Sequence, residues 1–285
     1  MKSLFKFIYI ITLLSLSVIA LYSCKKFKEN RSTTSSADNS LAENAFDDVF
    51  KVVNETAEDE NPNKSTSVYS FGDCAQITIN PAWPDTTFPK EIVIDFGTID
   101  CTGNDGRTRR GSIEYTITDR YRNSSSVITV TPNNYFVNDY KIEGLKKITN
   151  NGRNSNNNLN YTINVSNGKV TTPEDDIITW QSTRNREWIE GEATTFLTDG
   201  NNGIMDDVYS ITGNASGVSR NGTDFTVNIT EALIAKLNCR WITKGKLEII
   251  PDGLKTRKIN YGDGTCDNEA TVEIENRTYN IILLQ

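Results

Sequence analysis

The 285-residue chain carries 37 acidic and 30 basic side chains, a formal net charge of −7, and it contains no histidine. An acidic chain is poorly suited to nucleic acid, which requires a basic surface. Without imidazole, Ser-His-Asp and Cys-His catalysis and histidine-ligated zinc are excluded, whereas enzymes that use two carboxylates, Lys or Tyr are not.

The N-terminal segment, residues 1–23, has the layout of a secretory signal peptide, in which Lys2 and Lys6 flank the start of an apolar run over 7–21. The run is too short to span a bilayer comfortably as a mature helix. It ends in Leu21-Tyr22-Ser23-Cys24, which resembles the lipobox of bacterial lipoproteins. The resemblance implies cleavage before Cys24 and acylation of Cys24, with palmitate among the chains, so that the lipid bilayer is a partner. An uncleaved anchor with an incidental cysteine is the alternative.

The residues after Cys24 bear on localisation. Lys25 stands where inner-membrane lipoproteins tend to have Asp, and Lys26 and Lys28 leave no acidic export tag. We therefore expect a lipid anchor in the outer membrane, and the sequence leaves periplasmic and surface-facing positions both open.

Residues 24–40 are polar, rich in Ser, Thr, Asn and Lys, and predict a flexible tether between the lipid and the folded body. Ser40 and Glu43 then have the spacing of a capping box. Apolar residues follow at helical spacing: Leu41, Ala45, Val49 and Val52. We expect one amphipathic helix from about Leu41 to Thr56, followed by an acidic linker, so that helix and linker together occupy 41–66.

Residues 67–285 predict a single antiparallel β domain. Apolar and polar residues alternate, as in half-buried strands, in runs such as Ile113/Tyr115/Ile117, Tyr161/Ile163/Val165, Phe225/Val227/Ile229 and Tyr279/Ile281/Leu283. Turn dipeptides such as Asp105-Gly106 and Asn221-Gly222 separate them. The fold class is therefore mainly β, an antiparallel meander with the helix packed on it or shielding an edge. A sandwich, a barrel and one curved sheet all satisfy the pattern, and Asn150–Asn160 predicts a long solvated loop.

The four remaining cysteines are Cys74, Cys101, Cys239 and Cys266, and both pairs are 27 residues apart. Ile94-Asp95-Phe96-Gly97 before Cys101 corresponds to Ile259-Asn260-Tyr261-Gly262 before Cys266. This echo predicts two related units, about 69–118 and 234–283, each with its own disulfide. Cross-pairing of Cys74 with Cys239 and of Cys101 with Cys266 is the main alternative, because related units can pack side by side.

The first candidate site is a possible ligand face on the segment 180–192. At strand period, six side chains share one face: Trp180, Arg184, Arg186, Trp188, Glu190 and Glu192. Indoles, guanidiniums and carboxylates together could bind a sugar, but an ordinary solvent face with cross-strand charge pairs is the favoured interpretation. Glu190 and Glu192 have α-carbons roughly 7 Å apart, yet glycosidases usually take their carboxylates from different strands or loops, so no catalytic residue is assigned.

A second candidate is the run 199–207, which resembles short Asp/Asn/Gly calcium loops. The oxygen ligands would come from Asp199, Asn201, Asp206 and Asp207. Counted from Asp199, the glycine and the hydrophobic residue after it come one position earlier than in calcium loops, and no Glu closes the loop. A plain acidic turn is therefore favoured. Calcium is the only cofactor considered, because no nucleotide, haem or zinc motif is present. The basic run Arg107-Thr108-Arg109-Arg110 predicts a solvated hairpin end.

The lipobox, the capped helix, Ile94–Gly97, Arg184–Trp188 and Tyr261–Asn268 together resemble uncharacterised β-rich bacterial outer-membrane lipoproteins. The resemblance implies no activity. We predict a membrane-anchored envelope protein with a non-enzymatic binding or structural role and an unknown protein or glycan partner, with no nucleic acid partner. A carrier of a lipid or other apolar ligand in a curved sheet, and a carboxylate-based glycan hydrolase, are the alternatives.

Overall fold

The computed structural model describes residues 29–59, 69–195, 199 and 202–283. The predicted mainly β, antiparallel meander is confirmed, since fourteen strands form one sheet in which each strand pairs with the next along the chain, except that β3 pairs with β4 alone. The strands are β1 Gln76–Asn80, β2 Lys90–Asp95, β3 Cys101–Thr102, β4 Thr108–Ile117, β5 Val127–Val137, β6 Tyr140–Arg153, β7 Leu159–Thr171, β8 Ile177–Glu190, β9 Val208–Val218, β10 Asp224–Lys236, β11 Ile242–Pro251, β12 Arg257–Asp263, β13 Glu269–Ile274 and β14 Arg277–Ile282.

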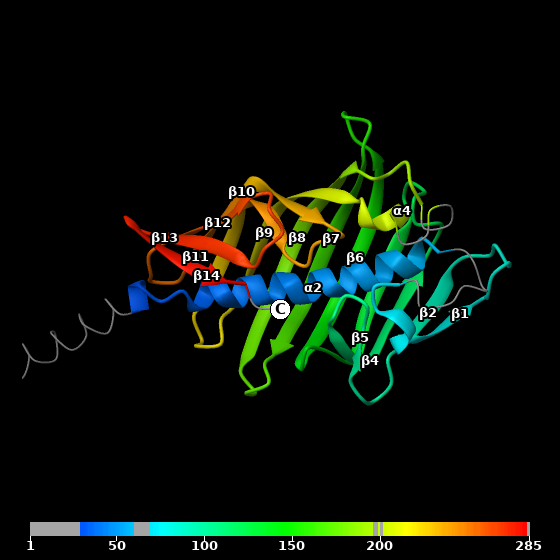
Figure 1. Ribbon diagram of the computed structural model, residues 1–285, viewed down its shortest axis with the longest axis horizontal. Helices are drawn as coiled ribbons and strands as arrows, with labels where there is room; N and C mark the ends of the chain where they lie inside the picture. The colour runs from blue at the N-terminus through cyan, green and yellow to red at the C-terminus, as the bar shows by residue number, and fades with distance from the viewer. Residues whose placement is uncertain (1–28, 60–68, 196–198, 200–201, 284–285) are drawn as a thin grey trace, which may run out of the picture.

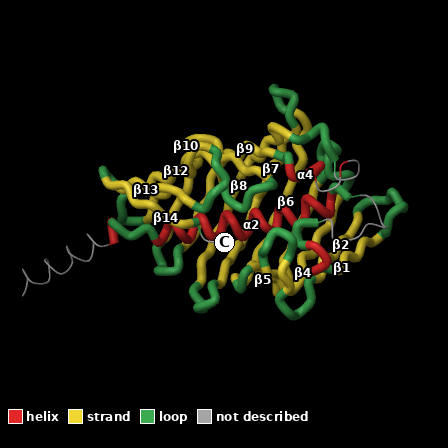
Figure 2. Tube along the Cα trace, viewed as in Figure 1, coloured by secondary structure: helices red, strands yellow, loops and turns green. Residues whose placement is uncertain are grey.

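The sheet is open and curved. Within the described part of the chain, β1 and β14 end the strand order and do not pair with each other. Of the three architectures that the sequence permits, the structure therefore has the single curved sheet. Its inner face packs on one long helix, α2 (Thr34–Ala57), which contacts β4, β6, β7, β8 and β11. Figures 1 and 2 show this helix crossing the strands, beginning beside β13 and β14 and ending near β1 and β2.

Helix α2 begins earlier than the sequence predicts. It starts at Thr34 rather than Leu41, so Ser40 and Glu43 lie inside it and form no N-terminal capping box. The expected tether is helical from Thr34 onward, and most of the helix is buried. Its polar side chains are buried because the sheet supplies partners: Asp38 accepts a hydrogen bond from Arg220 Nε at 2.7 Å. The predicted end at Thr56 agrees with the observed end at Ala57.

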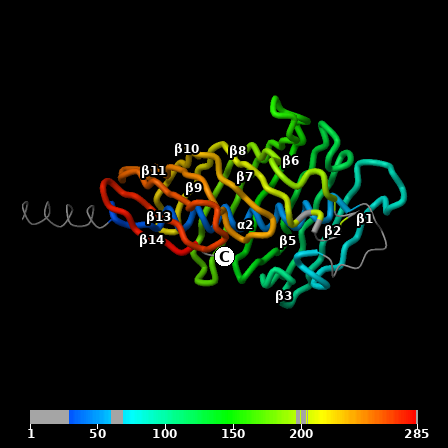
Figure 3. The backbone as a smooth tube through the Cα atoms, turned by 45° about the horizontal axis from the view of Figure 1, so that its top comes forward, coloured from blue at the N-terminus to red at the C-terminus, as the bar shows by residue number. Residues whose placement is uncertain are grey.

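Both predicted disulfides are present: Cys74 is bonded to Cys101, and Cys239 to Cys266. The first disulfide joins the segment before β1 to the first residue of β3, which follows β2, and so closes the β1–β2 hairpin. The second joins the segment before β11 to the segment after β12 and closes the β11–β12 hairpin. The short helix η2 (Gly72–Cys74) carries the first of these cysteines. The two Cys-containing units thus lie towards opposite ends of the sheet (Figure 3).

The internal echo has a local structural cause. After β2, the Asp95 carboxylate accepts a hydrogen bond from the backbone N–H of Gly97 at 2.8 Å. Asn260 accepts the equivalent bond from Gly262 at 3.1 Å. Both glycines have positive φ, 74° and 94°, which glycine adopts without steric cost. The repeated residues therefore form the same turn at corresponding positions of the two units.

The Asn-rich stretch is not a long loop. Strands β6 and β7 continue into it, so only 154–158 remain as the connection between them. The asparagines are accommodated in the strands because their amides bond across the hairpin: Asn151 Nδ2 donates to Asn160 Oδ1 at 2.9 Å. Polar residues can therefore continue the two strands here, because their side chains form hydrogen bonds with one another.

The signal peptide, the lipobox and Cys24 lie outside the described residues. Among the residues that are described, no helix has the length and apolar character needed to cross a membrane.

Candidate functional site

The predicted ligand face lies inside the protein. Trp180, Arg184, Arg186 and Trp188 are 1–5% exposed, because helix α2 and its surroundings cover this side of β8. Trp180 donates from its indole to Asn39 on the helix at 3.0 Å. The prediction of either an accessible binding face or a solvated charge face is therefore wrong for these four residues: the alternation identified a shared face but not what covers it.

The arginines of this face bind the helix instead. Arg184 forms an ion pair with Glu43 at 2.7 Å, and Arg186 forms one with Asp47 at 2.5 Å. The Arg186 guanidinium also lies 3.9 Å from the centre of the Phe50 ring. Buried guanidiniums need such partners, because an uncompensated charge in the interior is costly.

The two glutamates at the end of the stripe are not part of the buried face. Glu190 is exposed. Glu192 is partly exposed and receives hydrogen bonds from both terminal nitrogens of Arg153, at 2.6 and 3.0 Å. Neither lines a cavity among those described below. The hydrolase hypothesis consequently gains no support from their placement.

The three described residues of the calcium hypothesis, Asp199, Asp206 and Asp207, form no metal-binding group. Asn201 lies outside the described residues. Asp207, just before β9, is buried and accepts a hydrogen bond from the Trp188 indole at 3.2 Å, whereas Asp206 is exposed and bonds to Thr194. Burial, together with the nearby Glu58 and Asp206 carboxylates, raises the pKa of Asp207 to about 8. Within the described residues no group of three or more Asp, Glu or Cys side chains is arranged to hold a metal ion.

The basic run at 107–110 is also buried in part, against expectation. Arg107 and Arg109 are 6% and 0% exposed, and both form ion pairs with Asp48 of α2. Arg110 alone matches the predicted solvated hairpin end, since it is partly exposed and bonds to Asp100 and Asp139. Carboxylates of the helix thus pair with four buried arginines: Arg107, Arg109, Arg184 and Arg186.

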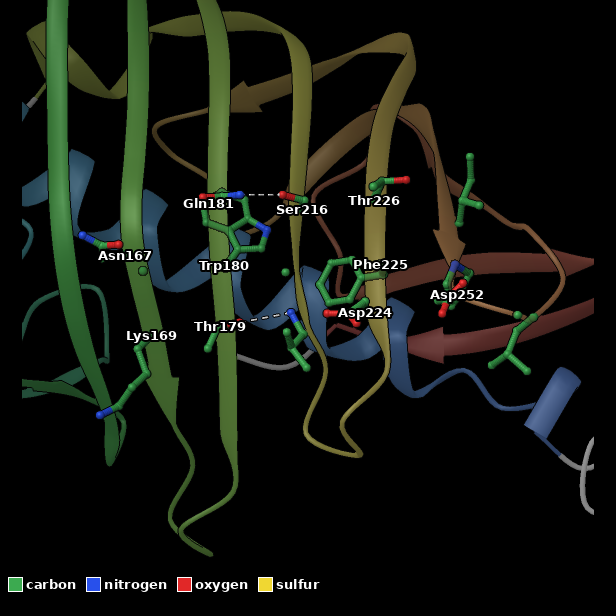
Figure 4. Close-up of a pocket in the computed structure, with 17 residues that line it drawn as sticks. Asn167, Lys169, Thr179, Trp180, Gln181, Ser216, Asp224, Phe225, Thr226 and Asp252 are labelled. Atoms are coloured by element: carbon green, nitrogen blue, oxygen red, sulfur yellow. Dashed lines mark hydrogen bonds between the residues drawn. The ribbon is translucent and has the colours of Figure 1, made fainter.

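An accessible groove lies on the other, outer face of the sheet. This groove of about 840 Å³ crosses β7 to β11 on the face directed away from α2. In Figure 4 the helix lies behind these strands. This volume is within the range of small-molecule sites in proteins, roughly 300–1,000 Å³. We refer to this surface as the outer groove.

Two rows of side chains across neighbouring strands form its floor. The strand registers place Gln181, Ser216, Thr226 and Ile250 side by side in one row, and Lys169, Thr179, Val218 and Asp224 in the other. Gln181 Nε2 donates to Ser216 Oγ at 3.0 Å, and the Thr179 hydroxyl accepts from Val218 N at 3.2 Å (Figure 4). The turn after β11, with Asp252 and Leu254, bounds one end.

Two glycines allow the strands to bend here. A Cβ built on Gly217 would lie 2.1 Å from the Thr179 carbonyl oxygen, and one on Gly168 would lie 2.4 Å from that of Trp180. Any larger residue would therefore force neighbouring strands apart. The register of β7 against β8 also shifts between Val165 and Gly168, and such irregularities increase local bending of a sheet.

The floor combines hydroxyl and amide groups with a larger share of apolar surface. Gln181, Thr179 and Thr226 are exposed, and Ile250 is 43% exposed. Lys169 adds one positive charge at the margin, and Asp224 and Asp252 add two negative ones. Such a surface offers many neutral hydrogen bonds and little net charge.

No sequence pattern identified the outer groove. Its residues alternate with buried ones, as on any half-exposed strand, and nothing in the order of residues places Gln181 beside Ser216 and Thr226. Gly168 and Gly217 were the only available signal, because glycine inside a strand marks close approach of another backbone.

Comparison with known proteins leaves the chain without an assigned relative: no family model, no curated protein and no solved structure matches it.

Proposed function

We propose that this protein is a membrane-anchored, non-enzymatic glycan-binding protein, held to the outer membrane through acylated Cys24, and that it binds a neutral polysaccharide segment in the outer groove. The observation that carries the proposal is the accessible 840 Å³ groove, whose floor combines apolar surface with the hydroxyl and amide groups of Thr179, Gln181 and Thr226. Sugars present many hydroxyl groups, and polar side chains with some apolar contact area are suited to bind them.

The position of the groove favours a glycan over an extended peptide. Peptides that add to a sheet pair with the free backbone groups of an edge strand. Strands β8, β9 and β10 are interior strands, each bonded to a neighbour on both sides. Recognition in the groove must therefore use side chains, which suits a ligand that is itself rich in hydroxyl groups.

Carriage of an apolar ligand is the weaker alternative. Such a ligand would lie on the concave face, but α2 occupies that face. Three cavities along the helix hold only about 10–40 Å³ each, and the larger cavity of about 370 Å³ at the helix start is lined mainly by polar residues. A drug-sized ligand needs a few hundred Å³. The carrier hypothesis therefore requires the helix to leave, which would expose the charges of Glu43, Asp48 and their arginines.

The test is binding of the full chain to a panel of bacterial and plant polysaccharides, measured by co-sedimentation or glycan array. Thr226→Trp fills the groove floor with a large side chain, and we expect it to weaken binding by at least about tenfold, because each lost hydrogen bond costs about 1 kcal/mol or more. Thr226 is exposed, so the substitution leaves the core unchanged.

Thr131→Trp on β5 is the matched control, since Thr131 is exposed but lies outside the groove. It should bind as the parent does. Equal binding by the two tryptophan variants, or no binding of any polysaccharide by the parent, would refute the proposal.

A further inference from the structure

A second cavity, of about 370 Å³, lies where the chain enters helix α2. Its walls come from the segment before the helix, the turn between β9 and β10, and the region between β11 and β12. Its lining differs in chemistry from that of the outer groove, although Pro251, Asp252 and Leu254 contribute to both. We refer to it as the helix-start cavity.

A buried arginine without a carboxylate partner lies in its wall. Arg257 is 1% exposed, and its terminal nitrogens donate to the carbonyl oxygens of Lys255, Glu29 and Ser32. Its Nε has no hydrogen-bond partner, and no ion pair reaches it among the described residues. Burial lowers the pKa of Arg257 with no carboxylate to oppose it.

The contrast with the other buried arginines is informative. Arg107 and Arg109 share Asp48, Arg184 pairs with Glu43, and Arg186 pairs with Asp47. Carbonyl oxygens satisfy the hydrogen bonds of Arg257 but do not neutralise its charge. A buried charge is normally compensated by an opposite one.

The start of α2 adds to this positive potential. The N-cap residue Thr33 makes no side-chain capping bond, the Thr34 N–H donates to Ser32 Oγ at 3.2 Å, and the first turn of the 24-residue helix contains no acidic residue. Helix N-termini carry partial positive charge and bind anions through free backbone N–H groups. Ser35 in that first turn lines the cavity, together with the hydroxyls of Thr34 and Ser219.

We propose that the helix-start cavity binds a phosphate group, either the phosphodiester of a lipid headgroup or a free phosphate. This inference does not depend on the outer groove. The cavity is lined by a buried cation, several hydroxyl groups and the first turn of a helix, which together match the acceptor oxygens of phosphate. Cys24 lies five residues before Glu29, at most about 18 Å of extended chain, so an acylated Cys24 would hold the cavity near the headgroups.

The carboxylates around the cavity limit the ligand. Glu29 and Asp252 line it, but both are exposed, so solvent and salt screen their charges. Arg257 by contrast is enclosed. A single compact anion can reach Arg257 with little repulsion, whereas an extended polyanion would contact both carboxylates.

The experiment is thermal unfolding of the detergent-solubilised full chain against increasing inorganic phosphate, with chloride at equal ionic strength as reference. Short-chain phosphatidylglycerol, below its micelle concentration, is the second probe. We expect the Tm to rise with at least one of them, because a ligand that binds only the folded state stabilises it. Saturation at lower phosphatidylglycerol than phosphate concentration indicates a headgroup, and the reverse order indicates free phosphate.

Three variants make the outcome decisive. Arg257→Gln should raise the apparent Kd for phosphate at least about tenfold. Because Arg257 also holds backbone carbonyls and its loss could unfold the chain, Ser35→Asp provides a second test: its carboxylate takes the place of the anion, so the Tm rises without phosphate and the response disappears.

Ser35→Asn is the neutral control and should keep the phosphate response, as should Arg277→Gln at an exposed site on β14. The proposal is wrong if neither probe raises the Tm of the parent, or if Ser35→Asp responds to phosphate as Ser35→Asn does.

Discussion

Asp48 shows how single residues hold this fold together. It is 1% exposed, and its carboxylate bonds to Arg107, Arg109 and Tyr135 at 2.5–2.7 Å. Burial alone would raise the pKa of Asp48, but the two guanidiniums outweigh burial and hold the pKa well below its usual range. The carboxylate is therefore charged at neutral pH and joins α2 to β4 and β5.

The variant Asp48→Asn should lower the free energy of unfolding by about 3–5 kcal/mol, because it leaves the buried guanidiniums without their main counter-charge. Urea unfolding measures the loss. Asp139→Asn is the matched control, since Asp139 pairs with Arg110 at 2.8 Å but its side chain is 60% exposed. That change should cost less than about 1 kcal/mol. Similar losses in both variants would contradict this account.

Among the elements, helix α2 is the one whose role the tertiary contacts define most strongly. Its ion pairs extend along its length, from Asp38 with Arg220 through Glu43 with Arg184 to Asp48 with Arg109. Lys146 of β6 adds a hydrogen bond to the Phe46 carbonyl oxygen at 2.5 Å. A helix held by so many partners from different strands is part of the core rather than a cover on it.

Removal of the start of α2 tests this interpretation. A chain beginning at Leu41 has the whole predicted helix but lacks Asp38 and Asn39, the partners of Arg220 and Trp180. We expect it to unfold at lower urea concentration than a chain beginning at Glu29, by about 3 kcal/mol in free energy, because a buried ion pair and a buried hydrogen bond are broken. Equal urea midpoints would show that 34–40 act as a tether.

The strands follow local rules more closely. In β4 and β10 the alternation of apolar and polar residues corresponds to buried and exposed sides, with Ile113, Tyr115 and Phe225 all at most 3% exposed. The units at Cys74–Cys101 and Cys239–Cys266 share the same local bond at the end of their second strand, from Gly97 to Asp95 and from Gly262 to Asn260.

At the scale of the whole molecule, buried carboxyl groups link stability to pH. Burial raises the pKa of Glu55 to about 7, even with Lys51 and the Ser70 hydrogen bonds opposing it, and burial also raises that of Asp207 to about 8. The folded protein therefore retains protons that the unfolded chain releases near pH 4. Stability from these groups is complete below about pH 4 and is lost as pH rises towards 7–8.

We expect the free energy of unfolding to fall by at least about 2 kcal/mol between pH 5 and pH 7. Over this interval Asp48 contributes no slope, because its low folded-state pKa affects stability only under more acidic conditions. Lys146, whose pKa burial lowers to about 7, contributes mainly above pH 7, where the unfolded chain binds more protons and stability rises.

The double variant Glu55→Gln, Asp207→Asn should remove most of this slope, measured by urea unfolding at both pH values. Both amides keep an oxygen to accept the bonds from Ser70 and Trp188. The exposed pair Glu91→Gln, Asp139→Asn serves as control and should keep the parent slope. A double variant as pH-dependent as the parent would refute the assignment.

The sequence by itself determined the features that depend on neighbouring residues: antiparallel strands from alternation and hairpins from turn residues. These succeed because backbone geometry repeats every two residues in a strand and because turns are set by a few adjacent residues. The repeated spacing of the cysteines favoured both disulfides but left cross-pairing open until the structure showed the pairs.

Only the tertiary structure decided which faces are covered and where the surface is hollowed. Trp180 and Arg184 share a face in the sequence as in the structure, but their burial depends on Asn39 and Glu43, about 140 residues away along the chain. The polar start of α2 resembled a tether because its partners lie on distant strands. The outer groove likewise depends on the curvature of the sheet, which arises from the register of several strands together.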